Sequence, residues 1–164
     1  MKSVTLVREI RAGPSTVFDL LSTAEGLTAW WGPDQLPVLS AEADVRVGGS
    51  FRVRFGAVDG SEHECAGEFI EVDPPERIVM SWRWTQGGVA EEQGATSRVE
   101  LQVRPRGRGA TLTLIHEGLR NAASVASHRQ GWNGAVEKLS SRLSRLPQRL
   151  CQNGSVTVDD RVSM

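Results

Sequence analysis

Residues 128–146, HRQGWNGAVEKLSSRLSRL, decide the fold of this chain. Their apolar side chains recur every three or four positions, which is the spacing of one face of an amphipathic helix. These apolar residues are Trp132, Val136, Leu139, Leu143 and Leu146. We expect a long helix from near Ser124 to Leu146 that ends at Pro147, because proline cannot continue a helix.

The residues before this helix predict a series of short antiparallel strands. Apolar and polar residues alternate at 51–55 and again at 78–84, which is typical of strands with one buried face. Turn-forming pairs separate the strands, at Gly48-Gly49, Asp59-Gly60 and Pro74-Pro75. We expect further strands at residues 4–11, 62–72, 99–103 and 112–116, and a short strand within 35–47. The adjacent Phe69 and Ile70 interrupt the alternation of 62–72, so we expect a bulge or a two-sided position there. Short helices are expected after Pro14 and over 27–31.

The order of these elements predicts an α+β fold. A sheet with one apolar face must be covered, and the long helix is able to cover it. We therefore expect a curled antiparallel sheet of about six or seven strands wrapped around the C-terminal helix, with two short helices after the first strand. Residues 1–147 should form one domain, with room for a small molecule between helix and sheet. Residues 148–164 lack a periodic apolar pattern and should form a mostly disordered tail.

Composition narrows the classes of partner. The net charge of −1 predicts no electrostatic attraction to nucleic acid. No stretch approaches the ~20 apolar residues of a membrane helix, and charged residues at 8, 9 and 11 interrupt any apolar run of a signal peptide. Cys65 and Cys151 lie far apart in the sequence, which favours a reduced, cytoplasmic protein. We expect a monomer, or a weak homodimer paired through an edge strand.

Neither a metal nor a cofactor is predicted. His63 and Cys65 share one side of a strand, but no second cluster has the spacing of a zinc site, and Cys65 is better explained as a small buried residue. The sequence also lacks a nucleophile elbow and a phosphate-binding loop. Arg52 and Arg54 alternate with apolar residues, which favours the outside of their strand. The alternative is that they point inward, where they could reach an anionic ligand in a cavity.

A set of motifs resembles one known group of proteins. They are residues 13–18 (GPSTVF), 27–33 (LTAWWGP), 46–51 (RVGGSF), 67–78 (GEFIEVDPPERI) and Gly131-Trp132 at the long helix. On these motifs, over residues 3–146, the chain resembles the SRPBCC or START-like superfamily. Within it, the chain is most similar to the group named after the activator of the ATPase of the ninety-kilodalton heat-shock protein. The resemblance implies a helix-grip fold with a cavity, and it does not imply one reaction.

The predicted ligand-binding residues lie on the inner face of the sheet, on the helix and in the Trp-Trp motif. They are Trp31, Phe51, Met80, Trp82, Trp84, Leu101, Leu114, His116, Trp132 and Val136. Aromatic side chains bury large areas and stack on flat ligands. An alternative is that Trp82 and Trp84 are ordinary core residues. Trp30 and Trp31 cannot both point inward from a regular element, so we expect one to anchor the short helix and the other to guard a cavity mouth or fix the loop.

Two histidines are placed near this interior. His116 shares a face with Leu112 and Leu114, so it should point inward, where it could donate to a ligand carbonyl or act as a base. The alternative is a core histidine bonded to a backbone carbonyl. Glu117 has the opposite parity and should face outward. His128 shares a helix face with Trp132 and should line an entrance or face solvent.

These observations leave three hypotheses for the function. The first is a non-enzymatic protein that binds a small hydrophobic or aromatic molecule. The second is an enzyme of the polyketide cyclase or hydrolase kind, with His116 or a carboxylate as general base; His116 is the one candidate catalytic residue. The third is a co-activator of a chaperone ATPase, which is less favoured because the chain lacks the second domain of the eukaryotic activator.

Overall fold

The computed structural model describes residues 2–32, 38–56 and 59–144. Their elements are β1 (Lys2–Ile10), α1 (Pro14–Leu21), α2 (Ala24–Trp30), β2 (Val38–Ala43), β3 (Ser50–Gly56), β4 (Glu62–Asp73), β5 (Arg77–Gln86), the short 3-10 helix η1 (Ala90–Glu92), β6 (Ser97–Arg106), β7 (Gly109–Leu119) and α3 (Ala122–Ser144). The predicted tail at 148–164 and the predicted helix end at Pro147 lie outside the described residues.

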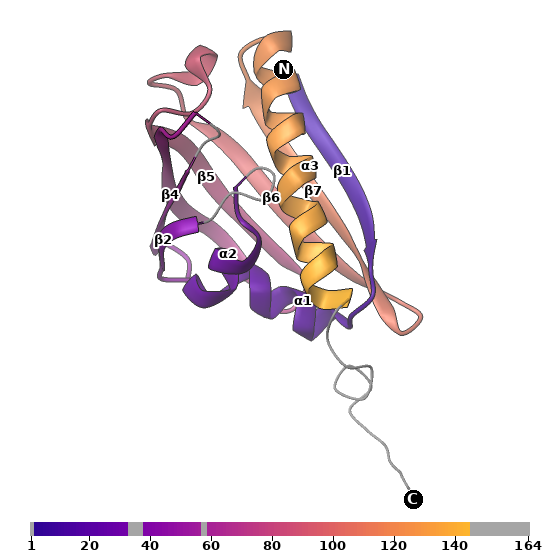
Figure 1. The fold of residues 1–164 in the computed structure, drawn as a ribbon. Helices are drawn as coiled ribbons and strands as arrows, with labels where there is room; N and C mark the ends of the chain where they lie inside the picture. The colour runs from indigo at the N-terminus through magenta and orange to yellow at the C-terminus, as the bar shows by residue number, and fades with distance from the viewer. Residues whose placement is uncertain (1, 33–37, 57–58, 145–164) are drawn as a thin grey trace, which may run out of the picture.

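The strands form one seven-stranded sheet in the order β1-β7-β6-β5-β4-β3-β2. All neighbouring pairs are antiparallel. The sheet curls around α3, while α1 and α2 lie at the end of the sheet where α3 finishes, and the β5–β6 loop lies at the opposite end (Figure 1). The predicted helix-grip fold is therefore confirmed. No helix in the described part of the chain is long and apolar enough to cross a membrane.

The strand β4 carries the predicted bulge. Its pairing with β5 shifts register between Phe69 and Glu71. The main chain of Phe69 also bonds the Gly48-Gly49 turn, with distances of 2.9 Å from Gly48 N to Phe69 O and 2.8 Å from Phe69 N to Gly49 O. Gly48 has φ +86°, a conformation that favours glycine. The turn before β3 thus anchors the bend of β4.

The helix starts differ from the predicted ones because two caps were missed. Thr23 caps α2 by accepting from Gly26 N at 2.9 Å, so this helix begins at Ala24 and not at the predicted Leu27. Asn121 caps α3 by accepting from Ser124 N at 2.9 Å, so α3 begins at Ala122. Both helices therefore start two or more residues before the predicted position.

The inner face of the sheet and α3 share one apolar core. The buried residues of α3 include Trp132, Ala135, Val136, Leu139 and Leu143. Opposite them lie inward-facing residues of the strands, among them Val4, Leu6, Leu101, Leu112 and Leu114. Because burial of apolar area is the main favourable term in folding, this helix face is what closes the sheet.

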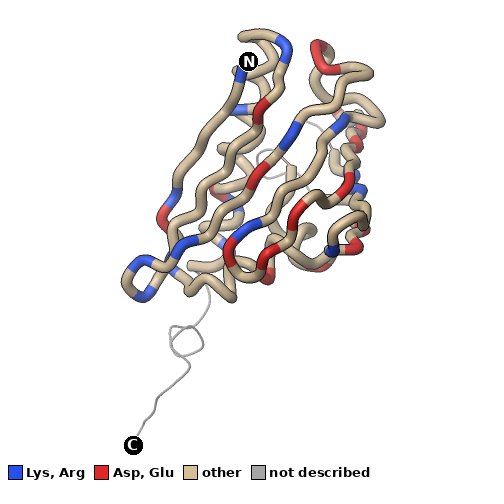
Figure 2. The backbone as a smooth tube through the Cα atoms, turned by 180° about the vertical axis from the view of Figure 1, so that it is seen from behind, with Lys and Arg blue, Asp and Glu red and all other residues tan. Residues whose placement is uncertain are grey.

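Charged residues recur along the strands of the sheet (Figure 2), and several of them pair across its outer face. Glu100 on β6 lies between Arg77 at 2.8 Å and Arg98 at 3.2 Å. The hydrogen bond from Arg77, helped by Gln102 and Arg98, lowers the pKa of Glu100. Arg98 also bonds Glu117 at 2.9 Å, which confirms that Glu117 faces outward.

The arginines of β3 also lie on this outer face. Arg52 and Arg54 are exposed and pair with Glu64 and Glu62 of β4, respectively. Their outward placement is therefore confirmed.

Candidate functional site

Three indole rings from three different elements meet in the interior. Trp31 follows α2, Trp82 lies on β5 and Trp132 on α3. Ring centroids are 5.5 Å apart for Trp31–Trp82, which are stacked, 5.1 Å for Trp82–Trp132 and 5.6 Å for Trp31–Trp132. Trp30 and Phe51 extend this group, with ring centroids 5.4 Å and 5.9 Å from that of Trp31. We call these five residues the aromatic cluster.

Both tryptophans of the Trp-Trp motif are buried, so the prediction that they could not both point inward was wrong. Trp30 is the last residue of α2, and Trp31 has extended backbone angles, φ −66° and ψ 154°. The spacing of a regular helix therefore does not apply to the pair. The indole N–H of Trp30 donates to the carbonyl of Leu20 at 2.8 Å, and that of Trp31 donates to the Cys65 sulfur at 3.3 Å.

His116 points into the interior from β7, as its parity predicted, and is fully buried. The indole N–H of Trp132 donates to its Nδ1 at 3.0 Å. Because an indole N–H can only donate, Nδ1 is the acceptor and the ring proton of neutral His116 is on Nε2. Nε2 then donates to the Ser97 hydroxyl at 2.7 Å. The partners are side chains, so the expected bond to a backbone carbonyl was wrong.

His128 is also buried, so its expected place at an entrance or in solvent was wrong. The indole N–H of Trp84 donates to its Nε2 at 3.2 Å. Its Nδ1 therefore carries the proton and donates to the Ser124 carbonyl at 2.9 Å. The rings of His128 and His116 are in edge contact, with centroids 4.7 Å apart.

The two imidazoles form a neutral polar centre beside the aromatic cluster. Burial, with a smaller effect from His128, lowers the pKa of His116 well below its usual value. Burial also lowers the pKa of His128, against opposing effects of the Ser124 carbonyl and of Glu92. All four ring nitrogens have partners. A general base needs a free lone pair, so catalysis by His116 would require Trp132 to move away first.

The β5–β6 loop covers the Trp84 end of this interior. The Gly88 N–H donates to Nδ1 of His63 at 2.6 Å, and a Cβ on Gly88 would overlap the Trp84 ring. Glu92 of η1 is buried, and its Oε2 accepts from Arg120 N at 2.8 Å and from the Ser124 hydroxyl at 2.6 Å. Glu92 thus binds the loop to the start of α3.

The sequence did not single out Glu92, because the loop read as glycine-rich and acidic. A polar residue buried by a helix terminus has no periodic signal along the chain.

Two buried polar side-chain atoms lack a hydrogen-bond partner in the described part of the chain. Among the described residues, the indole N–H of Trp82 is buried without a hydrogen-bond acceptor. The same holds for Oε1 of Glu92. Buried polar groups are nearly always bonded, so each such group points to something that can complete it.

The structure brings the predicted ligand-binding residues together in one interior. Trp84 is half-buried, and the others are buried; these are Trp31, Phe51, Met80, Trp82, Leu101, Leu114, His116, Trp132 and Val136. Trp30 and His128 belong to the same interior but were not among the predicted residues. Their signal was present, since Trp30 adjoins Trp31 and His128 lies one helical turn from Trp132.

In the described part of the chain, His63 and Cys65 of β4 have structural roles. Burial raises the pKa of the Cys65 thiol to about 12, so the group stays protonated and unreactive. His63 is bonded to the β5–β6 loop as described above. The described residues contain no group of three or more His, Cys, Asp or Glu placed to hold a metal ion.

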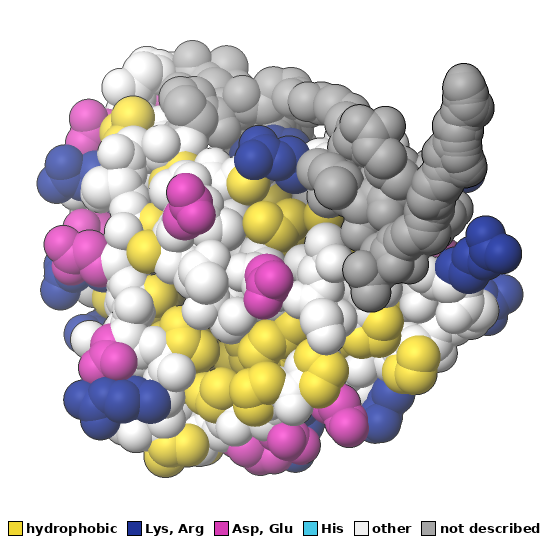
Figure 3. Space-filling model, turned by 90° about the horizontal axis from the view of Figure 1, so that it is seen from below, with side chains coloured by type: hydrophobic (Ala, Val, Ile, Leu, Met, Phe, Trp, Pro, Cys, Tyr) yellow, Lys and Arg dark blue, Asp and Glu magenta, His cyan; other side chains and the backbone are white. Residues whose placement is uncertain are grey.

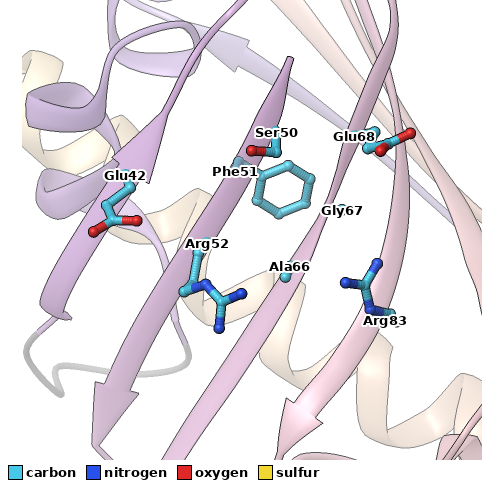
Figure 4. Close-up of a pocket in the computed structure, with 8 residues that line it drawn as sticks. All are labelled: Glu42, Ser50, Phe51, Arg52, Ala66, Gly67, Glu68 and Arg83. Atoms are coloured by element: carbon cyan, nitrogen blue, oxygen red, sulfur yellow. The ribbon is translucent and has the colours of Figure 1, made fainter. Parts of the chain in front are cut away.

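A hollow with a volume of about 230 Å³ lies on the outer face of the sheet. Ala66 and Gly67 lie between Arg52 and Arg83, with Glu42, Ser50 and Glu68 around them (Figure 4). Its lining is mainly polar and charged, unlike the apolar site predicted from the sequence.

Apolar side chains also gather at the surface on the end where α1 lies (Figure 3). Nine of the ten predicted ligand-binding residues are buried, and the tenth, Trp84, is half-buried, so this patch is a different feature.

A curled seven-stranded sheet around a long C-terminal helix, with an aromatic interior, defines a helix-grip protein. The chain belongs to the family described as Activator of Hsp90 ATPase homolog 1-like protein, whose family model matches residues 11–144. A search among curated proteins found no match.

Solved structures share the fold. An AHSA1 protein from Silicibacter pomeroyi is 28% identical with a TM-score of 0.75, over 87% of this chain and 98% of that one. A protein from Chromobacterium violaceum is 23% identical with a TM-score of 0.74, over 89% of this chain and 100% of that one. DynU16, from the dynemicin biosynthetic locus, is 22% identical with a TM-score of 0.71, over 88% of this chain and 48% of that one.

Proposed function

We propose that the chain binds a small hydrophobic or aromatic molecule between the sheet and α3, against the aromatic cluster. The observation that carries the proposal is the meeting of Trp31, Trp82 and Trp132 at centroid distances of 5.1 to 5.6 Å. Indole faces are large, flat and apolar, and they stack on planar ligands. Since the three rings come from β5, α3 and the residue that follows α2, a small shift of one of these segments would open space between them.

The β5–β6 loop offers a route into this interior. It covers Trp84, and its Gly87, Gly88 and Gly94 have positive φ values of 58°, 84° and 77°. Glycine is the residue that changes most easily between such backbone conformations. Glu92 is the residue whose side chain holds the loop to α3. Release of these bonds would uncover the half-buried Trp84 and the His128 ring beneath it.

The chemistry of the interior favours binding over catalysis. The Cys65 thiol stays protonated, and the lone pair of each imidazole already accepts an indole N–H. Neither group is free to attack or to accept a proton in this arrangement. A bound molecule would therefore meet apolar rings and neutral dipoles.

The test of binding uses the protein as purified. Native mass spectrometry should show an added mass that denaturation removes, and an organic extract should identify the compound. In parallel, apolar aromatic compounds should raise the melting temperature in a saturable manner. The chain has five Trp and no Tyr, so ligand contact with the cluster should also change its emission. Absence of added mass together with no effect of any compound would contradict the proposal.

The contact between His116 and His128 favours a second candidate, an enzyme of the polyketide cyclase or hydrolase kind. Paired imidazoles at 4.7 Å could transfer protons if a substrate displaced the indole of Trp132 or Trp84. His116→Gln retains a polar side chain but removes the titrating ring. Loss of turnover in this variant, with an unchanged melting temperature, would support the enzyme, and unchanged turnover would exclude this role for His116.

A further inference from the structure

The tryptophans of this chain differ in whether the indole N–H group has a hydrogen-bond acceptor within the described residues. Those of Trp30, Trp31, Trp84 and Trp132 donate to Leu20 O, Cys65 Sγ, His128 Nε2 and His116 Nδ1, respectively. That of Trp82 is buried and has no acceptor among the described residues. An unpaired buried donor costs free energy, so an acceptor that reaches it gains more than the same atom would in water.

The neighbours of Trp82 cannot supply that acceptor. Its ring contacts Trp31, Trp84, Trp132 and His116, with centroids between 5.1 and 5.5 Å away. The indoles are donors only, and Nδ1 of His116 already accepts from Trp132. Within the described part of the chain, the donor of Trp82 is thus left for a molecule from outside.

We infer that the molecule bound at the aromatic cluster carries a neutral acceptor oxygen, such as a ketone, aldehyde or quinone carbonyl, which accepts from the indole N–H of Trp82. This inference rests on the proposed function, and it adds the chemical class of the ligand. A hydrocarbon would leave the donor unpaired, and a protonated amine would bring only further donors to it. Only an acceptor completes the site.

The two imidazoles beside the aromatic cluster bring no positive charge to the site, and this bears on which acceptor is favoured. Both imidazoles are neutral, because each accepts an indole N–H, and burial opposes their protonation. The ammonium group of Lys138 also contacts the cluster, where it donates to the main-chain oxygen of Trp31 at 2.9 Å. A carboxylate would lose its hydration on entering this interior, and desolvation of a charge is costly. A carbonyl oxygen accepts the same hydrogen bond without that cost.

The experiment compares three probes of nearly equal shape, namely methyl naphthyl ketone, isopropenylnaphthalene and naphthoate. Calorimetric titration of the full chain should give the ketone a dissociation constant about tenfold lower than that of the alkene, and naphthoate should bind more weakly than the ketone. In Trp82→Phe, which keeps an aromatic ring but lacks the N–H, the two neutral probes should bind with similar affinity. In the control Phe55→Leu, which changes a buried aromatic side chain outside the aromatic cluster, the ketone preference should remain.

The outcomes separate the two proposals. If no probe binds, the proposed function itself fails. If ketone and alkene bind the wild-type chain equally, the interior does bind a molecule, but the inference about its oxygen is wrong. A buried water that already accepts from the indole N–H of Trp82 would give this result. If Trp82→Phe does not fold, NMR of the wild-type indole N–H groups replaces it: the ketone should shift the Trp82 signal more than the alkene does, and equal shifts would overturn the inference.

Discussion

The indole N–H of Trp132, on α3, donates to Nδ1 of His116, on β7, at 3.0 Å. This bond joins the helix to the sheet through the middle of the core, and it sets the imidazole proton on Nε2, facing Ser97. A second bond of the same kind joins Trp84 of β5 to His128 of α3. The helix is therefore held to the sheet by two indole–imidazole bonds in addition to apolar contact, and both bonds require neutral histidine.

The free energy of unfolding should fall as the pH drops below about 6.5, the usual pKa of histidine. The folded state lowers the pKa of His116 and of His128 below their unfolded values, so the unfolded chain binds more protons in the window between them. The stability that comes from keeping these two histidines neutral is fully present above their unfolded pKa. It is lost as the pH falls between the unfolded and the folded pKa, at up to about 1.4 kcal/mol per pH unit for each group. Urea unfolding from about pH 7.5 to pH 5 measures this slope.

A variant tests the assignment of that slope to the histidines. His116→Gln should reduce the pH dependence of unfolding in this window. The carboxyl groups Glu64 and Glu100, whose pKa values are lowered, would act only below their usual range near pH 4.5. An unchanged slope in His116→Gln would show that other groups bind the protons.

Alanine at Gly88 should destabilise the protein more than alanine at Gly94. Both glycines have positive φ, 84° and 77°, so both substitutions carry the backbone cost of about 1 kcal/mol. A Cβ at Gly88 would also overlap the Trp84 ring, whereas a Cβ at Gly94 meets nothing within 4 Å. The overlap should add about 1–3 kcal/mol to the loss for Gly88→Ala. Equal losses in urea unfolding would show that the loop does not press on Trp84.

Removal of the Glu92 carboxylate should loosen the β5–β6 loop. Glu92→Ala leaves the Arg120 N–H and the Ser124 hydroxyl without their acceptor, at a cost of about 1–3 kcal/mol. Hydrogen exchange at the amide of Arg120 should accelerate accordingly. Glu92→Gln is the control, because its amide oxygen can still accept, and it should retain most of the protection. Unchanged exchange in Glu92→Ala would mean that the loop is held by other contacts.

The thiol of Cys65 should resist alkylation in the folded protein. Its pKa is raised to about 12 by burial, and the thiolate is the reactive form. Iodoacetamide treatment of native protein near neutral pH, followed by peptide mapping, should leave Cys65 unmodified, and the same treatment in urea should modify it. Rapid modification under native conditions would show that β4 opens far more easily than its burial implies.

Periodic patterns predicted most of this fold from the sequence. The alternation at 78–84 correctly predicted β5, and the apolar spacing after His128 correctly predicted α3. Both patterns arise because one face of the element is buried. The helix starts were less well predicted, since the side chains of Thr23 and Asn121 act on single N–H groups and leave no repeating signal.

The candidate site shows where sequence reasoning stops. The parity of β7 placed His116 inward, but its partners come from β6 and α3, and a pattern along one strand does not contain them. Trp31 was misjudged because its backbone leaves the helix at that residue. The unpaired indole N–H of Trp82 can be recognised only when the hydrogen-bond acceptors around it are known, and these come from the three-dimensional structure.

The pairing of β1 with β7 has a consequence for how the chain reaches this structure. β1 begins at Lys2, and its partner β7 ends at Leu119, so the edge of the sheet joins two segments from opposite ends of the domain. Contacts between residues so distant in the chain slow folding, because a long loop must close before they form. During synthesis β1 must wait for almost the entire domain to be made, and its apolar side chains stay unprotected until β7 and α3 arrive.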